Sequence, residues 1–126
     1  MQSVKLALIL AVALAPAAFA QTANPYNGSW KISFDAEQIS NLEGTLVVKD
    51  DGGTWKVTAR ARNDPCIGRE APIAVTTASA EELAFAVHRS KVLAGCPDWT
   101  MKFKKVDDAT LKGTSGDGRV FLLTRK

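Results

Sequence analysis

The feature that most constrains the fold is an alternation of apolar and polar side chains in short segments. Across residues 28–35 every second side chain is apolar: Trp30, Ile32 and Phe34. The side chains between them are polar. A period of two residues is that of a half-buried β-strand. Similar patterns predict further strands at 43–49, 54–62, 72–77, 83–89, 99–106, 110–113 and 119–125.

Turn-forming residues separate these segments. The strongest hairpin signal is Asp50-Asp51-Gly52-Gly53, because tight turns need residues that tolerate positive φ. Residues 35–41 are polar and indicate either one helical turn or a wide loop. About eight short strands with no long helix predict an all-β fold, either a small antiparallel β-barrel or a β-sandwich.

The first twenty residues form a separate unit. Lys5 precedes an apolar run, and Ala18-Phe19-Ala20 supplies the small residues that a signal peptidase reads. The run is too short to span a bilayer, which needs about 20 apolar residues. We therefore expect residues 1–20 to be a cleaved signal peptide. Residues 21–126 then form a single β-barrel domain that is periplasmic or secreted.

The two cysteines, Cys66 and Cys96, both belong to the expected mature chain. An exported protein meets an oxidising compartment, and two cysteines allow only one intramolecular pairing. The spacing of about 30 residues differs from the C-x-x-C spacing of redox-active pairs. We predict a structural Cys66–Cys96 disulfide, for which the chain-entropy model gives roughly 3.5 kcal/mol.

The formal net charge of +3 falls by one when Lys5 leaves with the signal. A nearly balanced charge argues against a nucleic-acid-binding protein, which concentrates a basic excess.

Basic side chains nevertheless recur on the outward faces of two predicted strands. Lys56, Arg60 and Arg62 share one such face, and Lys102 and Lys104 share another. If the two strands are neighbours, these side chains form one basic face that suits a polyanion, a membrane surface or an acidic protein. The other interpretation is a solvated outer face.

No catalytic or metal-binding constellation is visible. His88 is the only histidine and stands at the end of a predicted strand, with no Ser, Cys or Asp at a recognisable motif spacing. One histidine and two oxidised cysteines do not make a zinc site. The paired acidic residues fall in predicted turns, where they serve turn formation and solubility. We expect no enzymatic activity, no metal and no cofactor.

The three tryptophans, Trp30, Trp55 and Trp99, fall on predicted inward faces. Aromatic side chains can line a binding cavity. They can also fill the interior of a small eight-stranded barrel completely. The short chain favours a filled interior, although the sequence leaves both alternatives open.

The stretch Tyr26-Asn27-Gly28-Ser29-Trp30-Lys31-Ile32 resembles the G-x-W start of the calycins, which include the lipocalins and the fatty-acid-binding proteins. The chain is also similar in this respect to small exported proteins of Gram-negative bacteria. The calycin resemblance implies that Trp30 closes one end of the barrel and that a basic residue of a late strand packs across it. Arg125 is the residue in that position.

These observations favour an exported, monomeric, non-enzymatic binding protein whose ligand is a small apolar molecule or an envelope component. The alternative is a protein-interaction or hydrolase-inhibitor domain that acts through exposed loops and the basic face.

Overall fold

The computed structural model describes residues 23–36, 39–58, 65–115 and 118–126. The expected signal peptide, residues 1–20, lies outside these ranges. Within them, no helix is long and apolar enough to cross a membrane.

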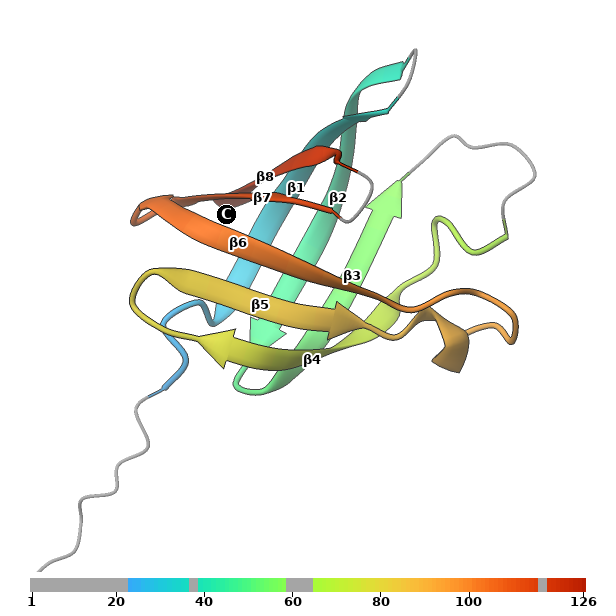
Figure 1. The fold of residues 1–126 in the computed structure, drawn as a ribbon, viewed down its shortest axis with the longest axis horizontal. Helices are drawn as coiled ribbons and strands as arrows, with labels where there is room; N and C mark the ends of the chain where they lie inside the picture. Colours follow the sequence, from blue (N-terminus) through green and yellow to red (C-terminus); the bar gives the residue numbers. More distant parts are fainter. Residues whose placement is uncertain (1–22, 37–38, 59–64, 116–117) are drawn as a thin grey trace, which may run out of the picture.

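Eight antiparallel strands form one closed barrel in which each strand pairs with the next along the chain (Figure 1). The last strand pairs with the first. The elements are β1 (Gly28–Ala36), β2 (Ile39–Lys49), β3 (Gly52–Thr58), β4 (Ala71–Ala78), β5 (Glu82–Val87), the 3-10 turn η1 (Arg89–Lys91), β6 (Trp99–Asp107), β7 (Thr110–Thr114) and β8 (Val120–Arg125). The all-β prediction is confirmed, and the architecture is the barrel rather than the sandwich.

The expectation of a helical turn or wide loop over residues 35–41 was wrong. Strand β1 continues through Ala36, strand β2 begins at Ile39, and these two residues are partners in the ladder. Extending the ladder pairs backbone N–H and C=O groups, and the polar composition of the segment does not oppose this pairing.

Inward side chains from all eight strands pack in the middle of the barrel. Trp30, Phe85 and Phe103 are fully buried, and Trp55 is 2% exposed. The rings of Phe85 and Phe103 stack with centroids 5.8 Å apart, and Trp55 lies 5.8 Å from Phe85. Side chains in contact leave no solvent at these positions, so the middle of the barrel is filled, as expected for this barrel size.

The two ends of the barrel are built differently (Figure 1). At the end that we call the closed end, very short turns join β2 to β3, β4 to β5, and β6 to β7. At the other end, the described residues 65–70 precede β4, and the connection of residues 88–98 joins β5 to β6. The Cys66–Cys96 disulfide links these two segments, and we call this the disulfide end. The predicted disulfide is confirmed.

Candidate functional site

Trp30 and Arg125 lie together at the closed end. Trp30 on β1 is the register partner of Arg125 on β8. The guanidinium carbon of Arg125 lies 4.2 Å from the centroid of the indole ring. The same guanidinium donates hydrogen bonds of 3.0 Å to the carbonyl oxygens of Asn27 and Pro25. This contact is the one that the resemblance implied. The guanidinium N–H groups of Arg125 already donate hydrogen bonds to backbone carbonyl oxygens.

Tyr26 completes the closed end. It is only 3% exposed, and its hydroxyl donates a 2.6 Å hydrogen bond to the carbonyl oxygen of Ser79. Its own carbonyl oxygen accepts a 2.8 Å hydrogen bond from the Trp30 indole N–H. Burial raises the pKa of Tyr26. An open groove of about 640 Å³ lies beside these residues, where Lys105 and Asp108 form a 2.9 Å ion pair. The polar groups at this end are therefore mostly paired within the protein.

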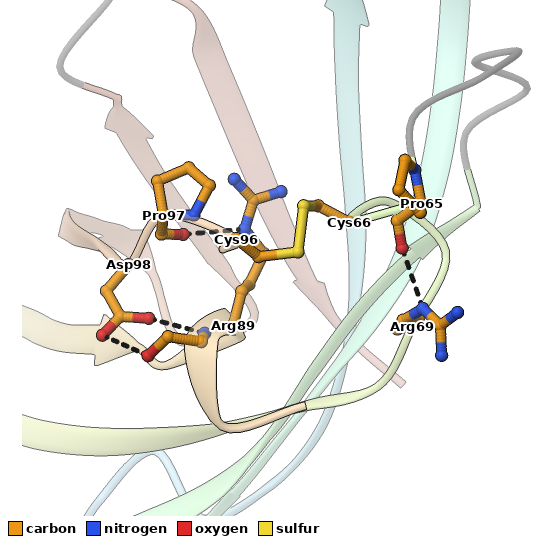
Figure 2. The surroundings of a disulfide bond; sticks show 8 residues. Pro65, Cys66, Arg69, Arg89, Cys96, Pro97 and Asp98 are labelled. Atoms are coloured by element: carbon orange, nitrogen blue, oxygen red, sulfur yellow. Dashed lines mark hydrogen bonds between the residues drawn. A yellow bond between two sulfur atoms is a disulfide. The ribbon is translucent and has the colours of Figure 1, made fainter. Parts of the chain in front are cut away.

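The disulfide end presents a different set of side chains (Figure 2). Arg89 of η1 stacks over the half-buried ring of Trp99, with its guanidinium carbon 4.1 Å from the ring centroid. Its Nε donates a 3.1 Å hydrogen bond to the carbonyl oxygen of Pro97, next to Cys96. The cation–π contact thus ties the 88–98 connection to β6, the hydrogen bond links two parts of this connection, and the disulfide joins it to the segment before β4.

Asp98 organises the polar side of the same connection. Its carboxylate accepts hydrogen bonds from the Ser90 backbone N–H at 2.8 Å and from the Ser90 hydroxyl at 3.0 Å. The Nδ1 atom of His88 lies 3.4 Å from the carboxylate. The two hydrogen bonds from Ser90, followed by the contact with His88, lower the pKa of Asp98.

Serine, histidine and aspartate meet here, but not in the order that nucleophilic catalysis needs. In a triad the histidine accepts the serine proton and the aspartate orients the histidine. In the described part of the chain, the Ser90 hydroxyl and His88 both contact the Asp98 carboxylate, and no hydrogen bond joins His88 to Ser90. Through Ser90, the Asp98 carboxylate ties the 3-10 turn to the residue that precedes β6. The sequence analysis missed the contact of His88 with Asp98.

Two buried indole N–H groups lack a hydrogen-bond partner among the described residues: those of Trp55 and Trp99. Their rings meet edge to face, with centroids 6.5 Å apart. Phe34 and Val57, inward residues toward the disulfide end, are 8% and 9% exposed, in contrast to the fully buried middle of the barrel. The inward residues on this side are thus slightly more exposed than those in the middle of the barrel.

The predicted basic face does not form as one surface. Lys56 on β3 and Lys102 and Lys104 on β6 are all exposed, but β4 and β5 lie between these two strands. The condition that the strands are neighbours was therefore wrong, because a closed meander pairs strands in chain order. Arg60 and Arg62 lie outside the described residues.

The lysines of β6 have a different neighbour. Lys112 on β7 lies directly opposite Lys104, and on its other side it faces Leu122 on β8. The sequence analysis did not select Lys112, since its strand is short and includes Gly113. The sequence feature that could have identified Lys112 as outward-facing is its position next to Leu111, which is buried.

No group of three or more His, Cys, Asp or Glu side chains able to hold a metal ion occurs among the described residues. Comparisons with models of protein families and with curated proteins gave no match. Among solved structures, a redesigned β-barrel is similar with a TM-score of 0.47 and 14% identity, over 81% of this chain and 92% of that one.

Proposed function

We propose that the protein is an exported, non-enzymatic binding protein that engages a protein partner, such as a hydrolase, through the disulfide end of its barrel. The observation that carries this proposal is the filled interior. Because Trp30, Phe85 and Phe103 are fully buried against their neighbours, the middle of the barrel offers no volume to a ligand. A partner must then bind at the surface of the barrel.

The disulfide end suits this role because its described loop residues, 65–70 and 88–98, are joined to each other. The Cys66–Cys96 bond joins these two segments, and Arg89 packs one of them on Trp99. A loop that is ordered before binding loses less conformational entropy in the complex. Loops held on a rigid scaffold commonly carry function.

The described residues of this end expose charges of both signs: Arg69 and Lys91, together with Glu70 and Asp98. Exposed charges at the rim of an interface steer the encounter and make association sensitive to salt. Export is supported by the expected signal peptide and fits the disulfide, which persists in oxidising compartments.

Site-specific photo-crosslinking in the envelope tests the proposal. Lys91→benzoylphenylalanine places the crosslinker at the disulfide end, and Lys49→benzoylphenylalanine is the matched control at an exposed lysine of the closed end. We expect a discrete protein adduct from position 91 and none from position 49. An adduct from position 49 alone, or no adduct from either position, would contradict the proposal.

A second candidate function is the binding of a small apolar molecule at the mouth of the barrel. The unpartnered indole N–H groups of Trp55 and Trp99 favour it for a ligand that carries a hydrogen-bond acceptor on an otherwise apolar body, because buried donors normally have an acceptor. This is the mode that a relationship to the calycins would suggest. Native mass spectrometry of the exported protein tests it directly. A stoichiometric small molecule whose removal changes tryptophan fluorescence would support this candidate, and a ligand-free mass would reject it.

A further inference from the structure

The outer wall over β6, β7 and β8 carries lysines beside exposed apolar side chains. The lysines are Lys102, Lys104 and Lys112, all exposed. The apolar side chains are Val120, which is 48% exposed, and Leu122, which is 38% exposed. We call these five residues the β6–β8 patch.

The strand register makes these residues one surface. In one cross-strand row, Lys104 faces Lys112, and Lys112 faces Leu122. In the next row, Lys102 and Val120 lie on either side of Thr114. Residues opposite each other on one face of an antiparallel pair lie within side-chain contact distance. Each row therefore runs from a lysine on β6 to an apolar side chain on β8.

The patch carries more positive than negative charge in the described part of the protein, with three lysines beside one carboxylate. Among the described residues, lysine forms ion pairs in Lys31–Glu43 and Lys105–Asp108. Neither pair includes a lysine of the patch. Glu82 on β5 is the carboxylate nearest in register, opposite Lys104, and it is half-buried. Like charges directly opposite each other in a sheet are destabilising. An external anionic surface would relieve this repulsion.

We propose that the β6–β8 patch binds the surface of an anionic lipid bilayer. Lysine ammonium groups attract anionic headgroups without the geometric match that a protein partner demands. Val120 and Leu122, beside them, can enter the boundary between headgroups and acyl chains while the lysine stems extend toward the phosphates. The patch contains no aromatic residue, and its cations are lysines, with exposed Arg119 standing next to Val120 at its edge. Protein interfaces are enriched in aromatic residues and depleted of lysine, so an acidic protein fits this patch less well.

This inference concerns a different surface from the disulfide end and does not depend on the function proposed there. Each lysine near an anionic surface increases partitioning by roughly five-fold, so losing two of them costs about 25-fold before any new repulsion. The apolar side chains add a contribution that salt does not screen.

Co-sedimentation with vesicles tests the proposal. The vesicles contain phosphatidylglycerol mixed with phosphatidylcholine, or phosphatidylcholine alone. Lys104→Glu/Lys112→Glu reverses two charges in the patch. Lys49→Glu/Lys56→Glu is the matched control, because it makes the same change in net charge at exposed lysines on β2 and β3. Val120→Ser/Leu122→Ser removes the apolar part. Circular dichroism verifies that each variant is folded.

We expect the wild type to bind the anionic vesicles and not the neutral ones. The patch double variant should lose at least about 25-fold in partitioning, and the control double variant should lose much less. The apolar variant should bind more weakly but keep its dependence on salt.

Three results would overturn the proposal. Equal losses in the two charge variants would mean that net charge alone drives binding. Equal binding to both kinds of vesicle would exclude recognition of charge. Retention on an immobilised acidic protein without binding to anionic vesicles would assign the patch to a protein partner.

Discussion

At the scale of single residues, the closed end depends on a few side chains that connect distant parts of the chain. Arg125 bonds to the carbonyl oxygens of Asn27 and Pro25, which lie about a hundred residues earlier. Trp30 lies beneath it and bonds to Tyr26. These side chains hold the N-terminal segment of the domain against the end of its last strand.

Trp30→Ala should abolish stable folding. The side chain is fully buried, and truncating a buried aromatic costs about 3–5 kcal/mol. The free energy of unfolding of a small domain is only about 5–15 kcal/mol in total. We expect a protein that is unfolded or melts far below the wild type in circular dichroism. A folded variant with an unchanged melting temperature would contradict the structural role of Trp30.

Asp98→Asn should destabilise the protein at neutral pH but not in acid. The folded state lowers the pKa of Asp98, so its stabilising effect is fully present above the pKa of the unfolded chain. That effect is lost as the pH falls through the lower, folded-state pKa. Thermal unfolding of both proteins over an acid-to-neutral series should show melting temperatures that converge at low pH. If the two melting temperatures differ by the same amount at every pH, the charge of the Asp98 carboxylate is not the cause of the difference.

At the scale of elements, some strands approach each other too closely for any side chain. A Cβ on Gly44 of β2 would meet the Lys56 carbonyl oxygen and would lie 2.8 Å from the Cα of Val57. Gly52 at the start of β3 has no such contact, since its nearest neighbour would be the Ile73 carbonyl oxygen at 3.8 Å. Closing a small barrel brings neighbouring backbones together at particular positions, and glycine permits this.

Gly44→Ala should therefore destabilise the barrel by about 1–3 kcal/mol, the usual cost of overpacking. Gly52→Ala is the control and should stay within about 1 kcal/mol of the wild type. Chemical denaturation of both variants measures the difference. Similar free energies of unfolding for the two variants would show that the β2–β3 approach is not tight.

The sequence predicted the elements much better than their arrangement. Alternation identified Trp30, Ile32 and Phe34 as inward residues of the first strand, and they are 0%, 0% and 8% exposed. Alternation shows which face a side chain occupies but not which strand lies beside it. The basic face was predicted wrongly for that reason. The contact of His88 with Asp98 depends on the path of a loop, and no periodicity encodes it.

At the scale of the whole molecule, the disulfide restrains the unfolded chain as well as the folded one. Cys66→Ala/Cys96→Ala should lower the free energy of unfolding by roughly 3.5 kcal/mol in the chain-entropy model. Reduction of the wild type should lower its melting temperature similarly. Free thiols that titrate in the non-reduced exported protein would contradict the pairing. An unchanged melting temperature after reduction would contradict its stabilising role.

The mature protein should begin at Gln21. The order of Lys5, apolar run and Ala18-Phe19-Ala20 predicts removal of the first twenty residues. Intact mass spectrometry of the protein from the envelope fraction measures this. A mass that includes residues 1–20 would contradict cleavage after Ala20.

Closure of the barrel by β1 and β8 makes two segments that lie far apart in the chain depend on each other. Pairing between such distant segments is slow compared with hairpin formation. Until β8 docks, β1 and β7 each present an unpaired edge, a known template for association between chains. We therefore expect a chain that lacks β8 to self-associate through these edges.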